Sequence, residues 1–423
     1  MLTRNYIELK EINLIKSDVL VDLRSLFIDI LISENIQNFY PTATINLNND
    51  TNQLYLAKLQ TDDIIQVKLK DSYSNDAQLI LRIKSIKITS NIKTGDIRST
   101  ENNQITLECI PFQFNMLNKV NIIDSFSDES AASMMASALT MLDLNPNNLL
   151  DIEESANKLN YTSAKPINYM IQYILKNGIS ATKTPYMLIT KHNININDKI
   201  ISLKSIQKYY TDGLLNLRNL YFLSDERDLN NERVANINNS VIIYSRKESS
   251  HQTENLYINK LKNIESQKLD LYRGKVDIIE GMDIIKYSKI LQDNFGKNPD
   301  LENNKKISFV RSADMNYDNS VKSYFEYDFL TKLLNLEKYI LTISENLNIH
   351  IGDICRFAEL QIKEQQPIFS NDMIISELVH VITNESSETN IKISPLDPYF
   401  INPSGKIEDL IRKLPKNLLG GII

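Results

Sequence analysis

The chain has 423 residues, a formal net charge of −6 at pH 7 and only two cysteines. Its length exceeds what one hydrophobic core usually serves, so roughly two to four domains are expected. The acidic balance argues against nucleic acid and anionic membrane surfaces as partners, and two cysteines are too few for a disulfide framework. Cys109 and Cys355 lie in strand-like apolar runs, where buried free thiols are expected.

No apolar run approaches the roughly 20 residues of a membrane span, and the start of the chain lacks the basic-then-apolar pattern of a signal peptide. We therefore expect no membrane association. The expected setting is a reducing cytoplasm, or export by a route that needs no such signal.

Residues 1–115 are predicted to form a first β unit, because five runs alternate apolar and polar residues with the period of a half-buried strand. These runs are Leu26–Ile32, Thr42–Leu47, Leu59–Leu69, Asp76–Ser90 and Asn103–Pro111. Pro41 and the Asn-Asn-Asp cluster at 48–50 flank the second run as turn signals. Five strands are enough for a small barrel or sandwich.

Residues 116–208 change character and predict a small α+β domain. Ser127, which is followed by the acids Asp128 and Glu129, is predicted to be a helix N-cap. Apolar residues then recur at helical spacing until Pro146, namely Met134, Met135, Ala138, Leu139 and Leu142. We interpret this methionine-rich stripe as part of a core.

A second helix in this region is predicted to begin at Pro166 and to end at Gly178, because proline is favoured in a first turn and glycine just past a helix end. Its apolar residues form a single stripe at helical spacing. Two predicted strands follow, Tyr186–Thr190 and Lys199–Leu203, and a polar turn joins them.

Residues 209–338 are interpreted as the start of a second β unit that carries an α/β insertion. Four runs are predicted to be strands: Ser240–Ser245, Leu269–Arg273, Lys275–Ile279 and Ile307–Val310. Asp283–Phe295 is predicted to be a helix, the polar tract 297–306 a loop, and 318–338 a helix that leads into the closing strands.

Residues 339–398 show the same alternation as the first β unit. The predicted strands are Tyr339–Ser344, Met373–Ile382 and Asn390–Ser394, and an Ile-Gly-Asp turn at 351–353 leads into a fourth. Antiparallel pairing is expected, with one face buried and the other wet. Residues 399–423 form a C-terminal tail that packs on a neighbour or is loose.

The two β units look like copies of one another. Asp63 matches Asp353 at an offset of 290 residues, and Thr89 matches Thr383 at an offset of 294. The four-residue difference fits within the loop between the strands. We therefore interpret the units as two copies of one small barrel.

The sequence contains none of the short motifs of phosphate-binding loops, dinucleotide sites, zinc proteases or serine hydrolases. The four histidines are His192, His251, His350 and His380, and no two stand at a spacing typical of a metal site. His350 and His380 are expected to serve packing or hydrogen bonding.

Several carboxylates stand where an acid or a base could be imagined, yet each has a structural explanation. Asp62, Asp63 and Asp353 precede strands at turns, where Asp satisfies backbone N–H groups. Glu280 and Asp283 precede a predicted helix, and acids are favoured at a helix start. We predict no catalytic, cofactor-binding or metal-binding residue, no cofactor and no enzymatic activity.

Three sets of residues carry a resemblance to a known family. The closing unit reads IHIGDICRF, NDMIISELVHVIT and TNIKISP, and the first unit reads TDDIIQVKL, QLILRIKSIKIT and NQITLECIP. The middle segment reads AKPINYMIQYILKNG, PYMLITKH and KIISLKSI. Together they resemble the baseplate hub (tail hub) proteins of contractile-tailed phages and the related head part of type VI secretion valine-glycine-repeat spike proteins. The chain departs at Asp62, where glycine is usual, and residues 209–330 do not align residue by residue.

The resemblance implies a mainly β fold with α+β insertions: two tube-type antiparallel β-barrels, a small α+β domain and a helical insertion. It implies a homotrimer whose six barrels form a ring of pseudo-sixfold symmetry, which joins the sixfold tail tube to the threefold central spike. The implied partners are the tail tube or tube-initiator protein, the central spike protein and the tape-measure protein. The implied location is a virion baseplate assembled in the host cytoplasm.

Symmetry supports the same hypothesis independently, since two similar barrels in each of three subunits present pseudo-sixfold symmetry from a threefold object. Two alternative functions stay open. One is a tail-associated hydrolase, which would need a cleft with paired carboxylates of shifted pKa. The other is a β-rich binding or adhesin module.

Overall fold

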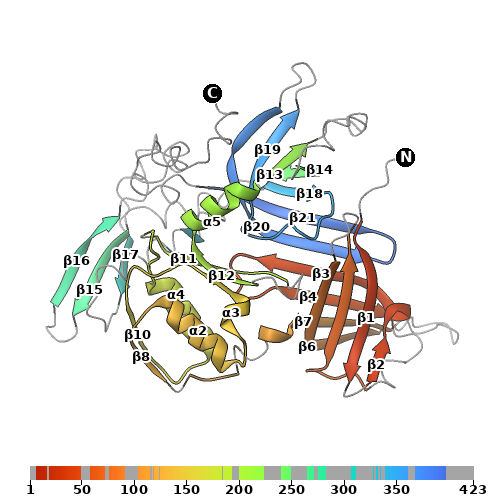
Figure 1. The fold of residues 1–423 in the computed structure, drawn as a ribbon, viewed down its shortest axis with the longest axis horizontal. Coiled ribbons are helices and arrows are strands. Elements are labelled where there is room, and N and C mark those ends of the chain that lie inside the picture. Colours follow the sequence, from red (N-terminus) through yellow and green to blue (C-terminus); the bar gives the residue numbers. More distant parts are fainter. Residues whose placement is uncertain are drawn as a thin grey trace.

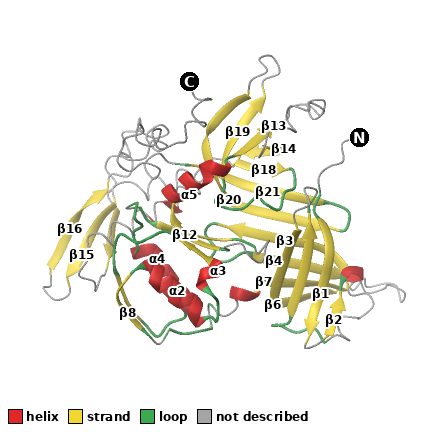
Figure 2. Cartoon of the chain, in the orientation of Figure 1, coloured by secondary structure: helices red, strands yellow, loops and turns green. Residues whose placement is uncertain are grey.

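A computed structural model describes residues 6–16, 19–48, 58–71, 76–90, 103–114, 117, 119–122, 124–182, 184–192, 200–222, 240–248, 264–270, 275–282, 306–310, 327, 330–331, 334, 339–360 and 367–396. Strands dominate these residues, and the helices lie mainly in the middle of the chain (Figure 2). The expectation of a mainly β fold is confirmed. Within the described ranges, no helix is long and apolar enough to cross a membrane.

The first strand group contains seven strands. They are β1 (Glu8–Lys16), β2 (Val19–Asp22), β3 (Phe27–Asn35), β4 (Thr42–Asn48), β5 (Ile64–Lys70), β6 (Asp76–Ser90) and β7 (Asn103–Pro111), with short 3-10 helices η1 (Arg24–Leu26) and η2 (Phe112–Phe114). They pair in the order β3-β4-β7-β6-β5-β1-β2, and every neighbouring pair is antiparallel. The sequence pattern does not predict β1 and β2, and β5 starts after the predicted start because residues 61–62 form a turn.

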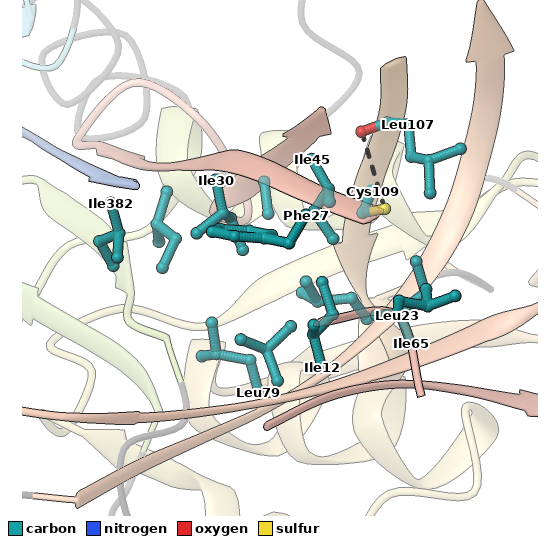
Figure 3. Packing of buried hydrophobic residues seen from close by; sticks show 14 of the residues in the cluster. Ile12, Leu23, Phe27, Ile30, Ile45, Ile65, Leu79, Leu107, Cys109 and Ile382 are labelled. Atoms are coloured by element: carbon teal, nitrogen blue, oxygen red, sulfur yellow. Dashed lines mark hydrogen bonds between the residues drawn. The ribbon is translucent and has the colours of Figure 1, made fainter. Parts of the chain in front are cut away.

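Alternate side chains of these strands form the first hydrophobic core. In β5, Ile65, Val67 and Leu69 are buried, whereas the residues between them are only half-buried. Figure 3 shows side chains from several strands meeting in this core, among them Ile12 of β1. Cys109 lies there as a free buried thiol, as predicted, and burial raises its pKa to about 12.

The second strand group closes on itself. Its strands are β13 (Arg218–Phe222), β14 (Ser240–Glu248), β18 (Tyr339–Ile343), β19 (Ile354–Leu360), β20 (Pro367–Thr383) and β21 (Ser387–Pro395). They pair in the cyclic order β13-β14-β18-β21-β20-β19, and β19 pairs back to β13. The sequence pattern does not predict β13, which runs parallel to both neighbours, so this group is not wholly antiparallel. Cys355 of β19 is the second buried free thiol, as predicted.

Five strands of the first group correspond one by one to five strands of the second. The order β3-β4-β7-β6-β5 matches the order β14-β18-β21-β20-β19. The pairing register matches as well: Ile65 is opposite Leu81, and Cys355, which comes 290 residues after Ile65, is opposite Met373. The same strand arrangement therefore occurs twice in the chain.

Irregularities in the pairing recur at corresponding places. The β6–β7 ladder shifts between Ile83 and Ser85, and the β20–β21 ladder shifts between Ile375 and Glu377. Corresponding residues of β6 and β20 are thus 292 residues apart, which makes Val381 the counterpart of Thr89. The expected match of Thr89 with Thr383 is wrong, because the offset between corresponding residues rises by two from β5 and β19 to β6 and β20, and not by four.

Residues 124–216, here called the middle segment, contain most of the helices. The elements are β8 (Ser125–Glu129), α2 (Ala131–Met141), α3 (Pro146–Leu149), β9 (Leu150–Ile152), β10 (Leu159–Thr162), α4 (Ile167–Asn177), β11 (Tyr186–Thr190), β12 (Ile201–Ser205), α5 (Ile206–Gly213) and η3 (Leu214–Asn216). β11, β12 and β9 form a sheet, and β8 pairs with β10. α2 and α4 pack against each other and share a third core with β11 and β12 (Figure 1).

Helix boundaries in the middle segment follow local signals, with one correction. Ser130, and not Ser127, is the N-cap of α2, and its side chain accepts a hydrogen bond from the backbone N–H of Ser133 at 3.0 Å. Ser127 instead lies in β8, because this strand continues the pairing with β10. The second predicted helix is confirmed as α4, with Pro166 and Gly178 as its flanking residues.

A separate sheet contains β15 (Ile264–Asp270), β16 (Lys275–Met282) and β17 (Lys306–Val310), in the order β16-β15-β17. The strands predicted over 275–279 and 307–310 are confirmed. The strand predicted over 269–273 begins earlier, at Ile264, and its residues 271–273 lie outside the described residues. β16 continues to Met282, so Glu280 lies in a strand.

Several sequence predictions fall outside the described residues. They are the helix over 283–295, the loop over 297–306 apart from Lys306, most of the helix over 318–338, and the tail 399–423. Within 318–338, Leu334 N–H donates to the carbonyl of Leu330 at 3.0 Å, a bond of helical spacing.

Candidate functional site

β3 and β20 lie side by side where the two strand groups meet (Figure 1). Their antiparallel pairing runs from Asn35 opposite Glu377 to Asp29 opposite Thr383. Through this pair the two groups form one 13-stranded sheet. Because the sequence carries no catalytic motif, this junction, which fixes how the two groups are held, is the candidate functional site.

Glu34 of β3 is the central polar residue of the junction, and only 1% of its surface is exposed. Its Oε1 accepts hydrogen bonds from the backbone N–H of His192 at 2.8 Å and from Nδ1 of the same residue at 3.0 Å. Its Oε2 accepts a hydrogen bond from the backbone N–H of Ile351 at 3.2 Å. One carboxylate therefore ties together β3, the residues after β11 and the turn before β19.

The surroundings of Glu34 favour its ionised form. Burial by itself penalises the charge, but the hydrogen bond from His192 and the nearby ring of His350 outweigh burial and hold the pKa of Glu34 well below its ordinary range. Nδ1 of His350 lies 3.6 Å from Oε1 of Glu34. The ring of His192 donates from Nδ1, because it faces an acceptor-only carboxylate. Its Nε2 is buried and has no hydrogen-bond partner among the described residues.

His380 of β20 lies on the same face of the sheet as Glu34. It is paired with Ile32, two residues from Glu34, so the two side chains are diagonal neighbours across the strand pair. The ring is buried, and its Nδ1 lies 2.8 Å from Oγ1 of Thr389. Burial lowers the pKa of His380 to about 3. As expected, His380 serves packing and hydrogen bonding, and its ring is neutral at pH 7.

Further contacts cross the junction. Oδ2 of Asp71 accepts a hydrogen bond from the backbone N–H of Leu347 at 3.0 Å, and Oγ of Ser387 accepts one from the backbone N–H of Ile7 at 2.7 Å. Leu347 and Ile382 belong to the second half of the chain but pack into the core of the first strand group, where Figure 3 shows Ile382 beside residues of β3. The junction is therefore buried and continuous.

Asp62 and Asp63 lie in a turn before β5, as the sequence predicts, and the Asp63 carboxylate accepts a backbone hydrogen bond. Asp62 has a left-handed backbone conformation, with φ of 75°. Its N–H donates to the carbonyl of Ile83 at 2.8 Å, and Ile83 N–H donates back to the carbonyl of Asp63 at 3.0 Å. Oδ2 of Asp63 accepts a hydrogen bond from the backbone N–H of Gln60 at 2.8 Å.

The turn at Gly352 and Asp353 repeats this arrangement bond for bond. Gly352 has φ of 84°. Its N–H donates to the carbonyl of Ile375 at 2.9 Å, and Ile375 N–H donates back to the carbonyl of Asp353 at 3.0 Å. Oδ2 of Asp353 accepts a hydrogen bond from the backbone N–H of His350 at 3.2 Å. Asp62 thus occupies the backbone position that Gly352 occupies in the second copy.

The surroundings of the two turns explain why only one needs glycine. Asp62 is exposed, with Nε of Arg82 at 3.2 Å and Nζ of Lys119 at 3.4 Å from its carboxylate. Gly352 is covered by β11, and a Cβ atom added to it would lie 2.3 Å from Cδ1 of Ile189. The middle segment therefore rests directly on the turn of the second strand group, whereas Asp62 in the turn of the first is exposed.

A polar cavity of about 170 Å³ remains where the middle segment covers the Gly352 turn. Nζ of Lys204 lies 2.5 Å from Asp151 and 2.9 Å from Asp212. Burial opposes the charge of Lys204, but the hydrogen bonds to these carboxylates outweigh burial and raise its pKa. Asp353 lies 3.6 Å from Nε of Arg218. The acids are paired with cations of the same chain, as is typical of a structural ion-pair network.

The structure brings together histidines that are far apart in the sequence. His192, His350 and His380 converge around Glu34, whereas His251 and Asp283 lie outside the described residues. Among the described residues there is no group of three or more His, Cys, Asp or Glu side chains that could hold a metal ion.

Glu34 belongs to none of the sequence motifs considered above, although a signal is present. Ile30, Ile32 and Glu34 alternate along one face of β3, and the two isoleucines are buried, so the acid continues a buried row. An acid in such a row requires a polar partner. Its partner His192 is 158 residues away, a distance at which sequence spacing carries no information.

No family model and no curated protein matches the sequence. Among solved structures, the chain is similar to the tail protein from Neisseria meningitidis MC58, with a TM-score of 0.55 and 7% identity over 94% of this chain and 98% of that chain. A second similar structure is the 43 kDa tail protein of prophage MuSo2 from Shewanella oneidensis, with a TM-score of 0.49 and 7% identity over 92% of this chain and 98% of that chain. A third is an E. coli component of the type VI secretion system, with a TM-score of 0.46 and 8% identity over 93% of this chain and 77% of that chain. The chain therefore has the fold of the Neisseria tail protein, in agreement with the resemblance to tail hub proteins that its sequence carries.

Proposed function

We propose that the protein is a structural hub of a phage-like contractile tail, with no catalytic role. The observation that supports this most strongly is the repeated strand arrangement, in which five strands recur with the same order, register and pairing shifts within one chain. Each strand group would act as one tube-type barrel. The cyclic pairing of the second group favours this interpretation.

Two similar barrels in one chain suit a symmetry adaptor. A homotrimer would present six barrels in a ring of pseudo-sixfold symmetry, because closed rings of identical subunits repeat each interface. One face would match the sixfold tail tube or its initiator protein, and the other the threefold central spike. Permanent interfaces of this kind bury roughly 2,000–5,000 Å².

The buried junction supports this role. A hub must hold its two barrels at a constant angle, and the β3–β20 pairing together with the buried Glu34 network would hold them so. The fold shared with a tail protein is consistent with a place in a virion baseplate assembled in the host cytoplasm. A tape-measure protein would pass through the ring.

The oligomeric state tests the proposal. Light scattering of the protein alone is expected to give three times the 48.7 kDa of one chain, or, if the ring forms only with its partners, a complex with tube and spike proteins that contains three copies of the chain. A homogeneous monomer under both conditions would exclude the ring, since six barrels cannot come from one chain.

A further inference from the structure

Three of the four histidines of the chain surround one buried carboxylate at the place where four segments meet. Glu34 and His380 come from the paired strands β3 and β20, and His192 and His350 come from the segments that cover this face. The Glu34 carboxylate accepts hydrogen bonds from His192 and Ile351, which belong to these covering segments. Proton uptake at this place therefore acts on the contact between the covering segments and the sheet.

We propose that Glu34, His192, His350 and His380 form an acid-sensitive latch. In neutral solution the latch holds residues 190–192 and the loop 347–353 on the β3–β20 face. In mild acid it releases them, while the strands of both groups stay paired. This property does not depend on the proposed assembly, because all four side chains belong to one chain.

Several charged groups border the latch on the surrounding elements. They are Lys191 next to His192, the buried acids Asp71 and Glu345, the Arg218–Asp353 pair and the Lys392–Glu377 pair. Asp, Glu, Lys and Arg ordinarily change charge outside pH 5 to 7, so within that window the change in charge comes from histidine.

The direction of the effect follows from proton linkage. The pKa of His380 is about 3 in the closed state, against an ordinary value of about 6.5 once water reaches the ring. The open state therefore binds more protons than the closed state, and closure weakens as pH falls below about 6.5. Because the pKa of Glu34 is lowered in the closed state, its ionised carboxylate also stabilises closure. This stabilisation is lost as pH falls below about 4.5.

Hydrogen exchange of the monomeric or assembled protein tests the latch, with rates divided by the intrinsic rate at each pH. The backbone amides of His192 and Ile351 report directly, because both donate to Glu34. Their protection factors are expected to fall about 25-fold between pH 7 and pH 5, as the titration of one buried histidine requires. Amides of the β6–β7 ladder, such as Leu107, are the internal control and should keep their protection.

A variant isolates the responsible group. His380→Gln keeps a polar partner for Thr389 but removes the titrating imidazole. The protection factors of the His192 and Ile351 amides should then fall less than about threefold between pH 7 and pH 5. The latch is refuted if wild-type protection at these two amides is the same at both pH values. Equal loss at the β6–β7 amides, or an unchanged fall in His380→Gln, refutes it as well.

Discussion

Replacing Glu34 by Ala is expected to lower the free energy of unfolding by about 3–5 kcal/mol, because removing one partner of a buried charged network leaves the others unpaired. The backbone N–H groups of His192 and Ile351 would lose their acceptor, and so would Nδ1 of His192. Urea unfolding followed by circular dichroism measures the change.

Glu377 offers a matched control, because it sits on the partner strand of the same junction but near its edge. Its carboxylate contacts Lys392 at 2.7 Å and Asn35 at 3.0 Å and is partly exposed. Partly exposed ion pairs contribute little to stability, so Glu377→Ala is expected to lower the free energy of unfolding by less than about 1 kcal/mol. Equal effects of the two substitutions would mean that Glu34 is not the central tie of the junction.

Replacing Gly352 by Ala is expected to destabilise the protein by about 2–4 kcal/mol. The left-handed backbone, with φ of 84°, costs an alanine about 1 kcal/mol. The added Cβ atom also meets Cδ1 of Ile189, which is fully buried, and overpacking of this kind costs about 1–3 kcal/mol. Urea unfolding again gives the value.

Asp62→Ala places the same residue in the equivalent turn of the first strand group, where the side chain is exposed. The substitution removes an exposed ion pair and places alanine in a left-handed backbone conformation. The free energy of unfolding is therefore expected to fall by about 1 kcal/mol.

Combining Gly352→Ala with Ile189→Ala isolates the steric contribution, since the shorter side chain at position 189 makes room for the new methyl group. The double variant should be more stable than the sum of the single changes predicts by at least about 1 kcal/mol. Strict additivity would show that the middle segment does not press on this turn.

Local signals predict most of the strands but only part of their arrangement. The alternation in Asp76–Ser90 gives β6 with both ends correct, and Pro166 and Gly178 mark the ends of α4. β1 escapes prediction because a shift in pairing between Leu9 and Glu11 breaks its alternation. β13 is short, follows a helix, and becomes a strand only through parallel partners on both sides.

The polar centre of the junction depends on contacts that no local pattern reports. The sequence shows His192, His350 and His380 as separate residues, and the pairing of β3 with β20 brings them to Glu34. By contrast, the twin turns at Asp62 and Gly352 are visible in the sequence, because turn geometry requires particular residues at fixed positions. What sequence reasoning misses here is long-range convergence and not local structure.

An image of the particle at low resolution, for example by negative-stain electron microscopy, tests the proposed hub most directly. The expected result is a threefold ring with six similar lobes around a central channel, because each chain contributes two copies of one strand arrangement. A particle of single-chain size, or an assembly without threefold symmetry, imaged alone and with tube and spike proteins, would contradict the proposal.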